Sequence, residues 1–183
     1  WFKTDWLCEW KFNEERFPNP KKFVQDLLKR GFKVSLWQLP YVAEDAEQID
    51  EARKNNYICK LTKQQDSEGS NFSALDYAGT IDFTSEKATN WYKGLLKNLL
   101  DMGVKCIKTD FGENIHMDAE YENMSPELLN NLYSLLYQKA AYEITKEVTG
   151  DGIVWARSAW AGCPGDPGRG GGDRCGSGDG LAG

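Results

Sequence analysis

A carboxylate follows directly after a short apolar strand in the middle of the chain. Residues 104–110 are predicted to form a buried strand that ends in Asp110. Because side chains alternate along a strand, Lys108 and Asp110 share one face. An unpaired buried charge is costly, so these two side chains must pair with each other or meet a ligand. The pattern therefore allows two interpretations, a structural Lys–Asp pair or a catalytic carboxylate that a neighbouring cation keeps ionised.

Composition and charge argue against several classes of function. The net charge is −6 without a basic stripe, so a nucleic-acid partner is not expected. No apolar run approaches the ~20 residues that span a membrane. One His and five Cys without a Cys-x-x-Cys pair make a metal site, a cofactor or a disulfide framework unexpected. Seven Trp and eight Tyr suit a carbohydrate-binding cleft, although an ordinary large core would also use them.

The cellular location stays open. Reduced cysteines and the lack of a visible signal peptide favour the cytoplasm. However, the chain starts at Trp1 rather than Met, and a missing N-terminus would hide a signal. The sequence is also compatible with an oligomer of the full-length protein.

The order of predicted elements favours an α/β fold with a parallel sheet. Three times, a capped amphipathic helix ends at a glycine and leads directly into an apolar strand. The caps are Asn19, Thr84 or Ser85, and Ser125; the glycines are Gly31, Gly103 and Gly150; the strands are residues 32–39, 104–110 and 153–158. A further helix is expected over residues 43–55.

Each predicted strand carries a polar or bulky residue near its end, namely Trp37, Asp110 and Arg157. In parallel α/β barrels the active site lies at the carboxyl ends of the strands. An open, flavodoxin-like sheet would place its ligand at the same ends, so this pattern alone does not choose between the two folds.

Two motifs resemble glycoside hydrolase family 31. Residues 107–113, Ile-Lys-Thr-Asp-Phe-Gly-Glu, resemble the family's nucleophile motif, and residues 155–162, Trp-Ala-Arg-Ser-Ala-Trp-Ala-Gly, resemble the segment before its acid/base. Residues 37–41 and 82–84 match as well. The resemblance covers residues 1–162 in the family's order. It implies a partial (β/α)8 barrel, about strands three to five with their helices, because a whole barrel needs eight strands and ~250 residues.

The resemblance divides the chain in two and assigns roles to single residues. Residues 1–162 would be the partial barrel, and 163–183 an irregular Gly-rich tail that is either disordered or aberrant. The implied catalytic pair is Asp110 as nucleophile and Asp173 as acid/base. The implied sugar-binding residues are Trp1 with Phe2, Trp37, Lys108, Phe111 and Arg157.

The implied activity is that of a retaining α-glycosidase, which uses two carboxyl groups about 5–5.5 Å apart and needs no metal or cofactor. Lys108 and Arg157 would favour the ionised form of Asp110. The expected substrate is a terminal α-linked sugar, with α-xylosidase first and α-glucosidase second. The fragment alone is expected to be inactive.

Other interpretations remain open. An α-galactosidase or transglycosidase of the same family would share these motifs, and a non-catalytic carbohydrate-binding barrel remnant would need the aromatic residues but not both carboxylates. A metal-dependent barrel enzyme using Asp110, Glu113 and His116 is disfavoured because the chain has a single His. A Ser-His-Asp hydrolase is disfavoured because no Gly-x-Ser-x-Gly elbow occurs.

Overall fold

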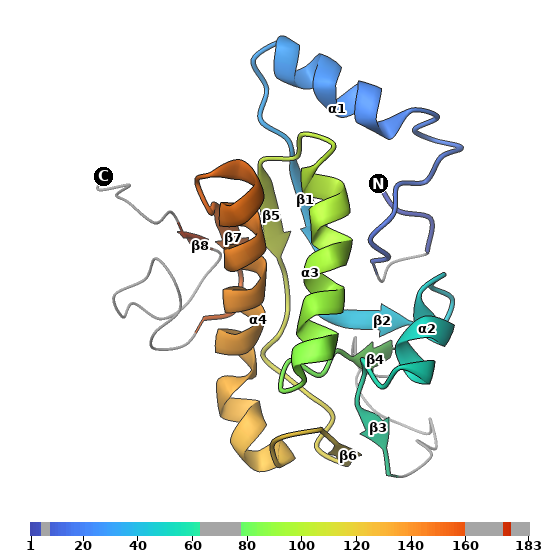
Figure 1. The fold of residues 1–183 in the computed structure, drawn as a ribbon, viewed down its shortest axis with the longest axis vertical. Helices are drawn as coiled ribbons and strands as arrows, with labels where there is room; N and C mark the ends of the chain where they lie inside the picture. The colour runs from blue at the N-terminus through green and yellow to red at the C-terminus, as the bar shows by residue number, and fades with distance from the viewer. Residues whose placement is uncertain (5–7, 63–77, 160–173, 177–183) are drawn as a thin grey trace.

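A computed structural model describes residues 1–4, 8–62, 78–159 and 174–176 of the chain. Its centre is a four-stranded sheet with two long helices packed on one face (Figure 1). The helices are α1 Pro20–Lys29, α2 Ile49–Lys54, α3 Glu86–Leu100 and α4 Pro126–Thr149. The strands are β1 Ser35–Gln38, β2 Tyr41–Ala43, β3 Lys60–Leu61, β4 Ala78–Thr80, β5 Cys106–Thr109, β6 Ala119–Glu120, β7 Val154–Ala156 and β8 Arg174–Gly176.

The main sheet has the order β1-β5-β7-β8, and β1, β5 and β7 run parallel. α3 precedes β5, and α4 connects β5 to β7 and contacts both strands. The two small sheets, β2-β4 and β3-β6, are antiparallel. The predicted α/β fold and its three parallel strands are therefore confirmed.

The predicted helix ends are found where local chemistry requires them. The Asn19 side chain accepts a hydrogen bond from the Lys22 amide (3.0 Å), and Ser85 Oγ accepts one from the Ala88 amide (3.5 Å). Ser125 occupies the N-cap position of α4 without a side-chain cap bond. Gly150 ends α4 with φ +86°, a left-handed conformation that glycine adopts without a Cβ penalty.

The helix expected over residues 43–55 is shorter than predicted. Only Ile49–Lys54 is helical, and Tyr41–Ala43 forms strand β2 against β4. All three β2 residues are buried. Backbone pairing with β4 places Ala43 in a strand, and this tertiary contact overrides the helix start predicted there.

The Gly-rich tail also differs from the prediction in one place. Residues 174–176 form β8, which pairs antiparallel with β7, whereas a (β/α)8 barrel contains only parallel strands. Pairing at a sheet edge uses backbone groups alone, so it does not need the apolar side chains that the tail lacks. The rest of the tail, including Asp173, lies outside the described residues.

The helix-facing side of the sheet is buried and partly polar. Leu36 and Ile107 are apolar, but Gln38 and Thr109 are polar and fully buried. Gln38 Nε2 donates to Tyr137 Oη (2.9 Å), and Thr109 Oγ1 donates to Gln138 Oε1 (2.6 Å) on α4. These bonds satisfy the buried polar groups and fix α4 against the sheet.

None of the helices in the described part of the chain is both long enough and apolar enough to cross a bilayer.

Candidate active site

The face of the sheet opposite α4 carries one row of large side chains. Trp37 on β1 is in register with Lys108 on β5, and Lys108 is in register with Trp155 on β7. Side chains at paired positions of neighbouring strands point to the same face, so the three lie side by side. Lys108 Nζ lies 5.1 Å from the centre of the Trp155 ring, a cation–π distance.

Asp110 lies just beyond the carboxyl end of β5, on the same face. Its backbone amide donates to the Gln38 carbonyl (2.9 Å), which continues the β1–β5 pairing by one residue. Its carboxylate receives hydrogen bonds from Trp37 Nε1 on Oδ2 (2.6 Å) and from the Phe111 amide on Oδ1 (3.0 Å). The side chain is 18% exposed, so the carboxylate is oriented yet still reachable from solvent.

The chain turns sharply after this carboxylate. Phe111 and Gly112 both have positive φ, +55° and +89°. Phe111 adopts a left-handed conformation that costs a non-glycine residue free energy, and such strain persists only where the surrounding structure enforces it. Tyr137 Oη donates to the Asp110 carbonyl (3.2 Å), and Ser134 Oγ donates to the Gly112 carbonyl (2.8 Å), so α4 holds the turn.

Arg157, the residue after β7, joins the same site. Its amide donates to the Thr109 carbonyl (3.0 Å), and its Nη1 lies 3.4 Å from Asp110 Oδ1. Its Nε is closer to another carboxylate, Glu113 Oε1, at 2.7 Å. Partial burial lowers the pKa of Arg157, but the charges of Glu113 and Asp110 outweigh burial and raise this pKa overall.

An aromatic wall flanks the carboxylate. Phe2 stacks on Trp37, with ring centres 5.8 Å apart and planes at 29°, and Trp1 Nε1 donates to the Trp37 carbonyl (2.8 Å). On the other side the Arg157 guanidinium lies 4.5 Å from the Phe111 ring centre. A carboxylate between apolar ring faces and fixed donors is chemically suited to attack at the anomeric carbon of a bound sugar.

Comparisons with known proteins identify the family of the chain. The family model described as "Glycosyl hydrolases family 31 TIM-barrel domain" matches residues 1–182. The chain is 33% identical over 162 residues to the α-xylosidase XylQ of Lactiplantibacillus pentosus, an alignment that covers 86% of this chain and 21% of that protein. It is 32% identical over 180 residues to an α-xylosidase of Emericella nidulans, covering 94% of this chain and 22% of that one.

The chain belongs to glycoside hydrolase family 31. It spans about a fifth of the length of these curated relatives. Among solved structures of family 31, a sulfoquinovosidase from E. rectale, in complex with an aza-sugar inhibitor, superimposes with a TM-score of 0.72 at 28% identity. That superposition covers 84% of this chain and 24% of the sulfoquinovosidase chain.

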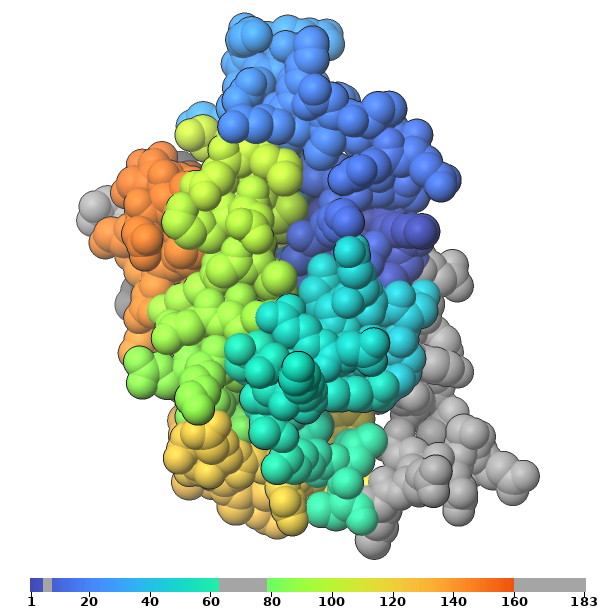
Figure 2. All heavy atoms as spheres, turned by 45° about the vertical axis from the view of Figure 1, so that its right-hand side comes forward, coloured from blue at the N-terminus to red at the C-terminus, as the bar shows by residue number. Residues whose placement is uncertain are grey.

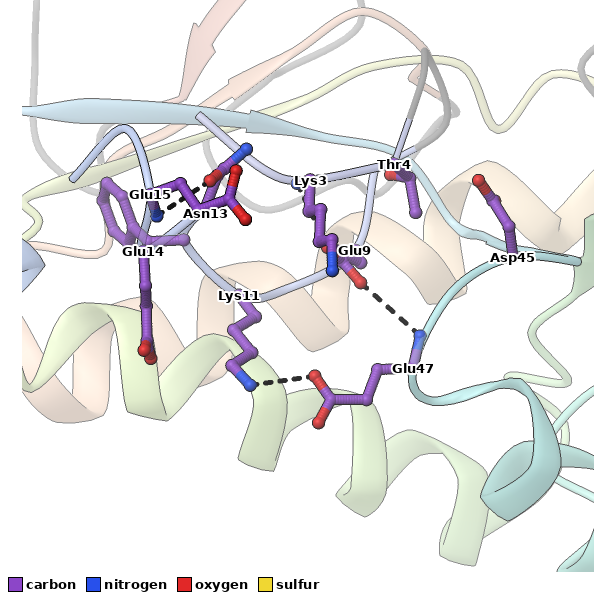
Figure 3. Close-up of a pocket in the computed structure, with 10 residues that line it drawn as sticks. Lys3, Thr4, Glu9, Lys11, Asn13, Glu14, Glu15, Asp45 and Glu47 are labelled. Atoms are coloured by element: carbon purple, nitrogen blue, oxygen red, sulfur yellow. Dashed lines mark hydrogen bonds and ion pairs between the residues drawn. The ribbon is translucent and has the colours of Figure 1, made fainter. Parts of the chain in front are cut away.

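A pocket of the described surface lies beside the N-terminal segment rather than at Asp110. Figure 3 shows Glu9 and Lys11 both reaching toward Glu47 across it. The buried Glu9 carboxylate accepts hydrogen bonds from the amides of Lys3 (3.1 Å) and Glu47 (3.5 Å), and Lys11 Nζ forms an ion pair with Glu47 (2.9 Å). Figure 2 shows the N-terminal residues lying against the segment that follows β1. Glu9 therefore anchors the segment that carries the aromatic wall.

The residues that the family 31 resemblance singled out are brought together, with one exception. Trp1, Trp37, Lys108, Asp110, Phe111 and Arg157 lie around the carboxyl ends of β1, β5 and β7. Asp173, the predicted acid/base, lies outside the described residues. The catalytic roles of Asp110 and Asp173, and the distance between their carboxyl groups, are therefore still predictions.

The metal-site interpretation does not fit the position of His116. Its buried Nδ1 lies 2.7 Å from Thr80 Oγ1 and 3.7 Å from Cys59 Sγ, within a packed cluster beside β4. Within the part of the chain that the structure describes, no group of three or more His, Cys, Asp or Glu side chains is placed to hold a metal ion.

Two residues of the site were missed by sequence reasoning. Glu113 entered the sequence analysis only through the disfavoured metal-site interpretation, yet its carboxylate lies 2.7 Å from Arg157 Nε. Trp155 was read as part of a motif without a role. Its place beside Lys108 follows from the parallel register, which the sequence does not state.

Proposed function

We propose that the full-length protein containing this chain is a retaining α-glycosidase that acts on a terminal α-linked sugar, with Asp110 as the nucleophile. One observation carries the proposal most directly. The Asp110 carboxylate is contacted by Trp37 from β1, by Arg157 from the end of β7 and by the Phe111 amide from the turn after β5, and it stays accessible. Fixed donors of this kind hold a nucleophile in the orientation needed for attack.

In the proposed first step, an oxygen of Asp110 attacks the anomeric carbon while the bond to the leaving oxygen breaks. The leaving oxygen takes its proton from the acid/base, for which Asp173 is the candidate. Water, deprotonated by the same group, then displaces Asp110 and regenerates the free carboxylate. Lys108 and Arg157 are proposed to hydrogen-bond the hydroxyl groups of the reacting ring, and Trp37 to contact one face of it.

The proposed substrate class is an α-xyloside first and an α-glucoside second. The support is the similarity to two proteins named α-xylosidases. Other relatives bear other names, among them a sulfoquinovosidase of Escherichia coli at 29% identity and an isomaltosyltransferase of Sporosarcina globispora at 24%. A panel of chromogenic α-glycosides, with product analysis for transfer to a second sugar, separates these specificities.

A mechanism-based fluoro-sugar is the decisive test, because only a nucleophile becomes covalently bound to it. With the full-length protein, we expect the label on the peptide that contains Asp110. We also expect Asp110→Asn to remove labelling and turnover while the fold is retained. Sugar binding without any covalent label would instead support a non-catalytic barrel remnant, and normal turnover by Asp110→Asn would refute the assigned role.

A further inference from the structure

Arg157 is held more closely by Glu113 than by the proposed nucleophile. The Nε of Arg157 lies 2.7 Å from Glu113 Oε1, whereas its Nη1 lies 3.4 Å from Asp110 Oδ1. Arginine and carboxylate commonly form a bidentate pair with two short, parallel hydrogen bonds. The contact with Asp110 is single and long, so Arg157 does not form such a pair with Asp110 in this structure.

The backbone that carries Glu113 is fixed on both sides. Ser134 Oγ on α4 donates to the carbonyl of Gly112 (2.8 Å), and Tyr41 Oη on β2 donates to the carbonyl of Asn114 (2.8 Å). A Cβ at Gly112 would approach Tyr137 Cδ1 to 2.7 Å, so this turn also packs tightly against α4. Glu113 thus projects from a rigid point, although its own side chain is 38% exposed.

The side chain of Arg157, in contrast, is not fixed by burial or by a position inside a strand. Its side chain is 44% exposed, and β7 ends one residue earlier, at Ala156. A long side chain that is ordered on a surface loses rotamer entropy, which its contacts must offset. The ion pair with Glu113 and the face of the Phe111 ring, 4.5 Å away, together select one position for the guanidinium.

We propose that Glu113 is a positioning residue that fixes Arg157 for contact with the bound sugar and keeps it from clamping Asp110. This inference rests on the proposed function of the site. Glu113 does not contact the reacting atoms in this role and acts only through Arg157. Its loss would leave Arg157 free to turn toward Asp110, which would weaken sugar binding and make the carboxylate a poorer nucleophile.

A double-mutant cycle in the full-length protein tests the proposal. We expect Glu113→Gln to lower kcat/KM by about tenfold to a hundredfold, because small displacements of a positioning group have effects of this size. In an Arg157→Ala background the same change should have little further effect, since the residue through which it acts is gone. Asp101→Asn is the matched control, because it removes an ion pair of similar length, 2.8 Å to Lys97 at the end of α3, and should leave kcat/KM unchanged.

Two outcomes would overturn the proposal. One is wild-type kcat/KM in Glu113→Gln; the other is an equal loss from Glu113→Gln with and without Arg157, which indicates a general structural role. Sugar affinity, measured calorimetrically in an Asp110→Asn background, repeats the cycle without turnover. If Glu113→Gln weakens sugar binding only when Arg157 is present, the positioning role of Glu113 is supported. If Asp110→Asn nevertheless retains normal turnover, the nucleophile assignment is refuted while the positioning role of Glu113 stands.

Discussion

The indole Nε1 of Trp37 donates a 2.6 Å hydrogen bond to Oδ2 of Asp110. These two residues are 73 positions apart and belong to neighbouring parallel strands, β1 and β5, with Asp110 one residue past the strand end. The tryptophan indole has one N–H donor and no acceptor. In this contact the carboxylate is therefore the acceptor, and the indole fixes its orientation. A residue expected to act as an apolar wall therefore also aims the proposed nucleophile.

Replacing Trp37 by Phe separates these two roles. The substitution keeps an aromatic face toward Phe2 but removes the donor to Asp110. We expect kcat in the full-length protein to fall by about tenfold to a hundredfold with a smaller change in KM, because a fixed charge-assisted hydrogen bond is lost. Steady-state kinetics on the preferred α-glycoside provide the measurement.

Trp91→Phe is the matched control for this substitution. The Trp91 Nε1 on α3 is buried and makes no hydrogen bond with a described residue. Removing it should not alter kcat. Equal kcat values for Trp37→Phe and the wild-type protein would show that the indole donor does not assist Asp110.

Gly112 is predicted to tolerate no side chain. It has φ +89°, and a Cβ would lie 2.7 Å from Tyr137 Cδ1 and 3.1 Å from Ser158 Oγ. We expect Gly112→Ala to lower the free energy of unfolding by about 2–3 kcal/mol, from backbone strain together with overpacking. Denaturant unfolding monitored by circular dichroism measures this change.

For Gly94→Ala we expect the opposite change, a small rise in the free energy of unfolding. Gly94 is exposed within α3, and a Cβ there meets nothing within 4 Å. Alanine in a helix interior is better than glycine by about 0.5–1 kcal/mol, so this variant should be slightly more stable. A similar effect of both substitutions would contradict the described packing of the turn.

Much of the framework could be predicted from the sequence because its signals are local. The cap at Asn19, the left-handed stop at Gly150 and the alternation that places Lys108 and Asp110 on one face each depend on a few neighbouring residues. The site contacts depend instead on register between strands. Which indole meets Asp110, and which carboxylate holds Arg157, is decided by elements that are far apart in the chain.

The two local errors have the same origin. Ala43 was placed at the start of a helix, but residues 41–43 form β2, which pairs with β4 more than 30 residues later in the chain. Residues 174–176 were placed in an irregular tail, but the open edge of β7 pairs with them. In both cases a distant strand supplied a partner that local composition could not reveal.

The hydroxyl of Tyr137 on α4 is predicted to stabilise the packing of this helix on the sheet. It accepts from Gln38 Nε2 (2.9 Å) and donates to the Asp110 carbonyl (3.2 Å) inside a fully buried region. Tyr137→Phe removes the hydroxyl that accepts from the buried side-chain amide of Gln38. We therefore expect the free energy of unfolding, measured with denaturant, to fall by about 1–3 kcal/mol. Tyr142→Phe on the same helix, whose hydroxyl meets only exposed Lys146 in the described structure, should change stability by less than about 0.5 kcal/mol.

Alkaline pH should unfold the protein through its buried tyrosines and thiols. Burial raises the pKa of Tyr92, Tyr133 and Tyr137 well above its ordinary value, and it raises the pKa of the Cys8 and Cys59 thiols in the same way. The folded state therefore holds protons that the unfolded chain releases. The stability that these groups contribute is fully present below their unfolded pKa values and declines above about pH 8.5 for the thiols and about pH 10 for the tyrosines.

Denaturant unfolding of the full-length protein across this pH range, with tyrosinate absorbance recorded in parallel, tests the linkage. We expect the free energy of unfolding to fall increasingly steeply above about pH 10, and the buried tyrosines to ionise only together with unfolding. Ionisation of all tyrosines near their ordinary pKa in a protein that stays folded would contradict the burial of Tyr92, Tyr133 and Tyr137 between α3, α4 and the sheet.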